Sequence, residues 1–164
     1  MTSKFGNWIL ISGSGIGAGK TTLARKFPGA SVMSLAGALR DDLAELHPDV
    51  NWHDRSQEYK NSRPESLGGL SVREKLVQFG QERCFLEKTY WPRRLMERMS
   101  WGAWPSHTFV VDDLRKTVEL DYFRQQGKSV LHLHIHHETA IPEPQYDSDA
   151  LFDVADYVIM RRRE

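Results

Sequence analysis

The sequence has little of what marks a secreted or membrane-embedded protein. Cys84 is the single cysteine, so no disulfide can form within the chain. No apolar run approaches the roughly 18 residues that are needed to span a bilayer. Residues 1–12 also lack the apolar core and the small-residue cleavage site of a secretion signal. We therefore expect a soluble protein of a reducing cytoplasm, with no membrane partner.

The chain also lacks an excess of either charge. Lysine plus arginine and aspartate plus glutamate each total 22, so the overall charge does not attract the protein to nucleic acid. A length of 164 residues predicts a single domain, residues 1–164, with one sizeable core.

What the sequence does contain is a series of short apolar runs bounded by turn residues. They are Trp8–Ile11, Ala30–Leu35, Phe109–Val111, Val130–Ile135 and Tyr157–Met160. Their near-continuous hydrophobicity is typical of parallel strands that are buried on both faces, and helical patterns separate them. The sequence therefore predicts an α/β fold, a three-layer sandwich with a mostly parallel central sheet of about five strands.

Helices are expected between these runs. They should span Lys20 to about Phe27, about Gly37 to Leu46, Ser71 to about Leu86, Pro92 to about Ser100 and about Lys116 to Gln126. Ser71 and Glu74 have the spacing of a capping box. Pro92 suits a first helical turn, and Gly127 is placed to end the last of these helices.

The most informative stretch is SGSGIGAGKTT, residues 12–22, after the first predicted strand. A strand, a glycine-rich turn and a helix place backbone N–H groups at the positive end of a helix dipole, which suits polyphosphate. The predicted cradle consists of Gly15, Ile16, Gly17, Ala18, Gly19, Lys20, Thr21 and Thr22. Lys20 would reach the β- and γ-phosphates of ATP, and Thr21 would hold Mg²⁺.

The loop departs from its consensus at one position. Ser14 stands where the first glycine of G-x-x-x-x-G-K-[ST] is expected. Gly13 or Gly15 could take the turn conformation instead, because glycine reaches positive φ without steric cost. The alternative is a glycine-rich turn without a ligand, which the order of strand, G-K-T-T and helix disfavours.

An aspartate pair follows a later apolar run. Asp112 and Asp113 come directly after Thr108–Val111, and the carboxyl ends of parallel strands share one edge of a sheet. Asp112 is therefore predicted to hold Mg²⁺ together with Thr21, through water. Asp113 is then free for another role, although an aspartate pair after a strand can also simply start a helix.

With these elements in place, the chain resembles phage-type deoxynucleoside monophosphate kinases and related P-loop kinases. The resemblance is carried by ISGSGIGAGKTT, SLAGALRDDL, SVREKLVQFGQERCFLEKTYWPRRL and FVVDDLRKTVELDYFRQQGKSVLHLHI, which span most of residues 9–135. It implies a P-loop kinase-type fold, a nucleotide substrate and, for a phage-encoded chain, the host cytoplasm. ATP and Mg²⁺ are implied at Lys20, Thr21 and Asp112. One departure is Glu138–Asp149, which contains none of the arginines of a lid.

The resemblance also implies which cations contact the acceptor. Arg115 would contact a transferred or acceptor phosphate. Together with Lys20 and Asp113, it makes up the predicted catalytic set. The polar segment Leu46–Leu70 is long enough to be a binding flap on the acceptor side. Substrate binding is assigned to Arg40, Arg63 and Arg73, with Trp52 as a further flap residue. Arg40 and Arg73 could equally be solvated helix charges.

Three functions agree with these features. The first is transfer of the γ-phosphoryl group of ATP to a deoxynucleoside monophosphate, whose ionised phosphate needs no base. The second is phosphorylation of a 5-hydroxymethylpyrimidine such as 5-hydroxymethyluracil in phage DNA, with Asp113 or Asp41 as the base. The third is a non-kinase P-loop ATPase or nucleotide-binding switch, although the guanine motif N-K-x-D is absent.

A row of histidines occupies the fourth apolar run. His132, His134 and His136 alternate along a predicted strand and should share one face. Such positions lie roughly 7 Å apart, which is too far for three imidazoles to converge on one zinc ion. We therefore expect these histidines to pack or to face the surface rather than to bind metal.

Overall fold

The protein is described by a computed structural model that covers residues 5–100 and 107–162. Five strands form one sheet: β1 (Phe5–Gly13), β2 (Ser31–Met33), β3 (Thr108–Val111), β4 (Gly127–His137) and β5 (Tyr157–Arg161). Their order is β2-β3-β1-β4-β5, and all four strand pairings are parallel. The predicted α/β fold with a parallel sheet of about five strands is confirmed.

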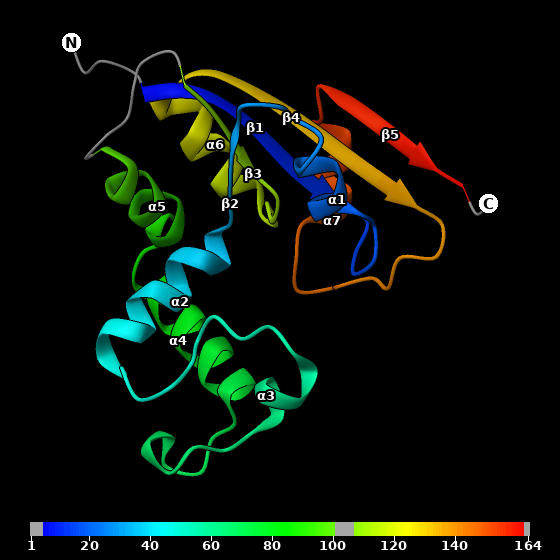
Figure 1. The fold of residues 1–164 in the computed structure, drawn as a ribbon. Helices are drawn as coiled ribbons and strands as arrows, with labels where there is room; N and C mark the ends of the chain where they lie inside the picture. The colour runs from blue at the N-terminus through cyan, green and yellow to red at the C-terminus, as the bar shows by residue number, and fades with distance from the viewer. Residues whose placement is uncertain (1–4, 101–106, 163–164) are drawn as a thin grey trace.

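The helices of the described residues lie on both faces of this sheet. They are α1 (Lys20–Ala24), α2 (Leu35–Leu46), α3 (Gln57–Asn61), α4 (Val72–Leu86), α5 (Tyr90–Ser100), α6 (Thr117–Gln126) and α7 (Ser148–Asp153), with a 3-10 turn η1 (Glu65–Leu67). Ile11 of β1 packs with Ala18 and Ala24 on the α1 side. Trp8 and Leu10 pack on the opposite side, in the core that α2, α4, α5, α6 and α7 share. The result is a three-layer arrangement, with residues 47–70 at the end of the molecule away from the sheet (Figure 1).

Local hydrogen bonds explain where the helices begin and end. The predicted capping box is present, because the Glu74 N–H donates to Ser71 Oγ and the Ser71 N–H donates to Glu74 Oε2. Helix α2 begins at Leu35, two residues earlier than expected, because the Ser34 side chain caps it by accepting from the Gly37 N–H at 2.8 Å. Helix α1 ends before Phe27, since the residue before a proline is disfavoured in helical conformation.

Several other expectations need correction. The segment Leu46–Leu70 contains α3 and η1, and Trp52 within it is 1% exposed in the core. The irregular segment Glu138–Asp149 leads into α7, which the sequence patterns did not predict. Helix α6 ends at Gln126, as expected, but Gly127 directly after it is already the first residue of β4. No helix within residues 5–100 and 107–162 is long and apolar enough to cross a membrane.

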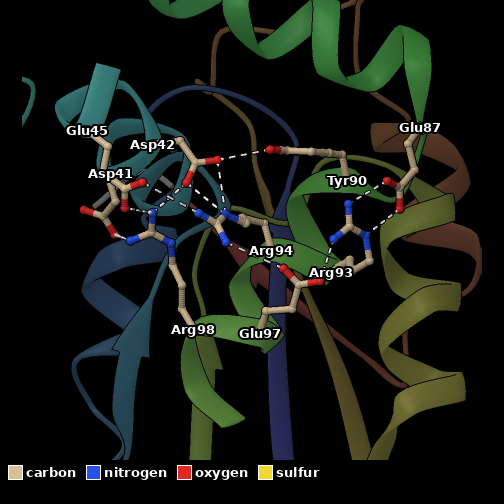
Figure 2. Close-up of polar contacts among 9 residues, drawn as sticks. All are labelled: Asp41, Asp42, Glu45, Glu87, Tyr90, Arg93, Arg94, Glu97 and Arg98. Carbon is tan, nitrogen blue, oxygen red and sulfur yellow. Dashed lines mark hydrogen bonds and ion pairs between the residues drawn. The ribbon is translucent and has the colours of Figure 1, made fainter. Parts of the chain in front are cut away.

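An ion-pair network joins α2 to α5 (Figure 2). The carboxylate of Asp42, on α2, accepts hydrogen bonds from Tyr90 Oη at 3.2 Å, Arg94 Nε at 3.0 Å and Arg98 Nη2 at 2.6 Å. Asp42 is buried, whereas Glu45 at the edge of the same network is exposed. This network fixes the position of α2, which leads from the sheet toward residues 47–70.

Candidate functional site

The phosphate loop lies between the end of β1 and the start of α1. Gly17 and Gly19 have φ angles of 85° and 92°, which L-residues with side chains rarely adopt. Ser14 instead extends the pairing with β4, since its N–H donates to the Ile135 carbonyl at 3.0 Å. The conformational demand of the missing consensus glycine therefore falls on Gly15, whose φ is 152°.

Lys20 folds back over this loop. Its Nζ donates to the carbonyl oxygen of Gly15 at 3.0 Å. Burial lowers the pKa of the ammonium, Glu143 opposes that effect, and Arg115 adds to it. A partly desolvated cation beside backbone donors is well suited to a phosphate oxygen.

Thr21 and Asp112 meet across the same edge of the sheet. Thr21 Oγ1 donates to Asp112 Oδ2 at 2.7 Å, and Asp112 is buried. Hydroxyl and carboxylate oxygens are the ligand types that Mg²⁺ takes in nucleotide sites, together with phosphate oxygens and water. The pair therefore fits the Mg²⁺ that the sequence resemblance implies.

Asp113 is occupied by α2. Its Oδ1 accepts from the Leu35 N–H at 2.7 Å and its Oδ2 from the Ala36 N–H at 2.9 Å. Burial raises the pKa of this carboxyl, and the two N–H groups and Arg115 oppose the shift. These contacts give Asp113 a structural role at the first turn of α2, and its role as a base stays a prediction.

Asp41, the other candidate base, also has partners. Its carboxylate forms an ion pair with Arg98 Nη1 at 3.0 Å and lies 3.3 Å from His53 Nε2. Both carboxylates that a hydroxyl acceptor would use are therefore engaged in contacts within the protein.

Arg115 and Lys20 line one small cavity beside the phosphate loop. This cavity also includes Glu143 and Tyr146. The guanidinium of Arg115 lies 4.6 Å from the centre of the Tyr146 ring and donates to the Tyr146 hydroxyl. Arg115 and Lys20 therefore lie together beside the phosphate loop, and the contact of Arg115 with a phosphate group stays a prediction.

Glu119 is a site-supporting residue that sequence patterns did not indicate. Its Oε2 accepts from the backbone N–H groups of Arg115 and Lys116 at 2.9 and 3.0 Å, so it fixes the segment that carries Arg115. Burial raises the pKa of Glu119 to about 7. Its i+4 spacing from Arg115 at the start of a helix is the one local signal that could have found it.

A group of cations lies on the side of α2, α3 and α4. Burial lowers the pKa of Lys60, and Arg40, Arg73 and Arg55 lower it further, so each of these three arginines lies within electrostatic reach of Lys60. Nε of Arg40 is buried and has no hydrogen-bond partner among the described residues. We call Arg40, Arg55, Lys60 and Arg73 the cation cluster. It contains two of the three predicted substrate-binding arginines and two residues that were not predicted.

Arg63, the third predicted substrate-binding arginine, points elsewhere. Its Nη1 pairs with Glu74 Oε2 at 3.0 Å and donates to the Gly69 carbonyl. The structure therefore places Arg63 at the start of α4, in an exposed ion pair, and its contact with substrate stays a prediction.

The histidine row is partly a core feature. Ser12 Oγ lies 2.7 Å from His132 Nε2 and 2.9 Å from His134 Nδ1, and all three residues are buried. Burial lowers the pKa of both imidazoles to about 4. Within the part of the chain that the structure describes, no group of three or more His, Cys, Asp or Glu is placed to hold a metal ion.

No protein-family model matches the chain, and no curated protein matches it. Three solved structures illustrate its likeness in fold. A sugar kinase from a Janibacter species is 16% identical, with a TM-score of 0.41 over 95% of this chain and 84% of that one. TT1252 from Thermus thermophilus is 18% identical, with a TM-score of 0.46 over 96% of this chain and 90% of that one. A dephospho-CoA kinase from Campylobacter jejuni is 12% identical, with a TM-score of 0.48 over 97% of this chain and 90% of that one. At these values function has to be argued from the site itself.

Proposed function

We propose that the protein is an ATP-dependent kinase that transfers the γ-phosphoryl group to a deoxynucleoside monophosphate. The observation that carries the proposal is the hydrogen bond of Thr21 to Asp112 at the start of α1, next to Lys20. Arg115 lies within electrostatic reach of both Lys20 and Arg40, because its charge affects the pKa of each.

The residues present suit phosphoryl transfer. The bond from the γ-phosphorus to the β–γ bridging oxygen breaks, a bond to an acceptor oxygen forms, and ADP leaves. The protein has to align the acceptor and neutralise charge on the transferred group, with little covalent work. Lys20 and Arg115 are the cations for that task, and Mg²⁺ supplies further charge neutralisation when ATP is bound.

The contacts of Asp113 and Asp41 favour a phosphate as the acceptor. An ionised phosphate oxygen attacks without a general base, and both candidate bases already have partners. The cation cluster is the corresponding anion site, because like charges that are held together are stabilised by an anion between them.

Four neighbouring cations also suit several phosphates of a DNA backbone, which keeps base-hydroxymethylated DNA as the second candidate. The two acceptors differ in their response to salt. Contacts with several DNA phosphates release counterions and make the affinity fall steeply with salt, whereas a free nucleotide gives a shallow dependence.

The deciding experiment is transfer from γ-labelled ATP to free deoxynucleoside monophosphates, unmodified DNA and base-hydroxymethylated DNA. We expect label on a free monophosphate. Label on modified DNA alone would reject this acceptor but keep the kinase. ATP hydrolysis without transfer to any acceptor would instead support a non-kinase ATPase.

Two variants test the assignment of residues. Lys20→Ala should fold and lose transfer, whereas Lys26→Ala, at an exposed lysine just after α1, should behave as wild type. Near-normal transfer by a folded Lys20→Ala variant would reject the phosphate-loop assignment. Arg40→Gln should raise the acceptor KM by about tenfold, since a hydrogen bond between charged groups is worth about 1.5 kcal/mol or more. The ATP KM should hardly change. Arg63→Gln, in the same assay, tests whether Arg63 also contacts the acceptor, as the sequence predicts.

A further inference from the structure

Residues Glu138–Asp147, which we call the strap, run across the phosphate loop. Figure 1 shows this segment leaving the end of β4 and passing beside the loop between β1 and α1. Ile16 and Ile141 form an antiparallel bridge in which each N–H donates to the other's carbonyl oxygen at 2.9 Å. A backbone donor of the predicted phosphate cradle is therefore bonded to the strap.

Glycine at position 15 permits this close approach. A Cβ atom on Gly15 would lie 2.0 Å from the carbonyl oxygen of Ile141, far inside van der Waals contact. The glycine that replaces the consensus turn residue thus also provides the space into which the strap fits.

The far end of the strap is anchored as well. Asp147 Oδ2 accepts from the N–H and the hydroxyl of Thr117, both at 3.0 Å. Ser148, the next residue, donates from its hydroxyl to the Gly13 carbonyl at 3.1 Å. Together with the contact between Tyr146 and Arg115, these bonds hold the strap against both β1 and the start of α6.

Little space remains beneath the closed strap. The cavity lined by Lys20, Arg115 and Glu143 measures about 10 Å³, which is roughly what one water molecule needs. A phosphate group does not fit there. On its other side the strap borders a cavity of about 740 Å³, which gives it room to move.

Glu143 lines the small cavity together with the two cations, and its negative charge acts on both Lys20 and Arg115. The strap contains no lysine or arginine, so it cannot add positive charge to a transferring phosphate. A carboxylate near Lys20 and Arg115 competes with an anionic ligand for the same two cations.

We propose that the strap is a self-inhibitory plug, which closes the space beside Lys20 and Arg115 that a phosphate group would take and brings the negative charge of Glu143 near these two cations, so that bound polyphosphate has to displace it. This inference rests on the proposed function, because it needs a polyphosphate ligand. The apparent affinity is then reduced by the fraction of open molecules. An open fraction of roughly 10% weakens binding about tenfold.

The test compares E143Q with E138Q by calorimetric titration, using ATP and inorganic tripolyphosphate as the probes. E143Q keeps the shape of the side chain and removes its charge, so both probes should bind about three- to tenfold more tightly. E138Q is the matched control, since Glu138 lines the larger cavity and not the small one, and its affinity should equal that of wild type. Equal affinity of E143Q and wild type would overturn the plug and leave the proposed function standing.

Amide hydrogen exchange gives an independent readout. In the wild-type protein without nucleotide, the Ile16 and Ile141 N–H groups should exchange slowly, and saturating tripolyphosphate should speed both. Unchanged protection with ligand bound would overturn the plug, because the strap would then stay closed over an occupied site. If neither wild type nor E143Q binds either probe, the proposed function fails, and the plug fails with it.

Discussion

Replacing Asp42 with asparagine should destabilise the protein by about 2–3 kcal/mol. Removing one partner of a fully buried ion pair costs roughly 3–5 kcal/mol, because a charge is left unpaired. Here the side chain of Asp42 is 8% exposed, whereas those of Arg94 and Arg98 are 31% and 26% exposed. Water and other carboxylates therefore still reach both arginines. Arg98 keeps its pair with Asp41 at 3.0 Å, so we expect less than the full cost.

The assay is urea unfolding followed by tryptophan fluorescence, since Trp8, Trp52 and Trp91 are buried and should report loss of the core. Glu45→Gln is the matched control. Its side chain is 68% exposed in the same network, and exposed ion pairs contribute only about 0.2–1 kcal/mol. A loss for Asp42→Asn no larger than that for Glu45→Gln, at an unchanged denaturant slope, would refute the view that Asp42 holds α2 on α5.

The remaining predictions concern pH and the core. Burial raises the pKa of Glu119 from 4.5 to about 7, so the folded state holds this proton more tightly. The free energy of unfolding should therefore fall as pH rises from about 4.5 to about 7. Glu119→Gln should weaken this pH dependence, which urea unfolding at several pH values measures. Burial lowers the pKa of His132 and His134 from 6.5 to about 4. The free energy of unfolding should therefore fall as pH falls from 6.5 to about 4, because the unfolded state binds these protons more readily. NMR spectra in which His132 and His134 titrate near pH 6.5 in the folded protein would contradict this expectation. Trp52→Phe should cost about 1–2 kcal/mol of stability and leave the acceptor KM unchanged.

The fold was predictable where local pattern and tertiary structure agree. Each of the five strands coincides with one apolar run of the sequence. For the central strands the reason is burial on both faces, which needs apolar residues at nearly every position, whereas the edge strands β2 and β5 keep apolar residues although much of their surface is exposed. The capping box of α4 is likewise a local signal that the structure contains. The phosphate loop was also predictable from a local signal, since its glycines with positive φ and the following lysine lie within one short stretch.

The remaining parts of the site depend on contacts between distant segments. Alternation placed His132 and His134 on one face, but only the pairing of β1 with β4 brings both against Ser12. Lys60 comes within electrostatic reach of Arg40 only through the path of residues 47–70, which has no apolar periodicity. The bridge between the strap and the phosphate loop likewise joins segments whose sequences show no complementary pattern.

The two aspartates after β3 have a geometric consequence. Asp112 binds Thr21 of α1 on one side of the sheet, and Asp113 holds the first turn of α2 on the other. A single peptide unit, about 3.8 Å between Cα atoms, therefore joins the anchor of the proposed ATP side to that of the proposed acceptor side. The distance between the Cα atoms of Asp112 and Asp113 is set by the peptide unit, so a change in side-chain packing does not alter it. The ion pairs of Asp42 with Arg94 and Arg98 of α5 hold α2 a second time, so the proposed acceptor side is tied at two points of α2.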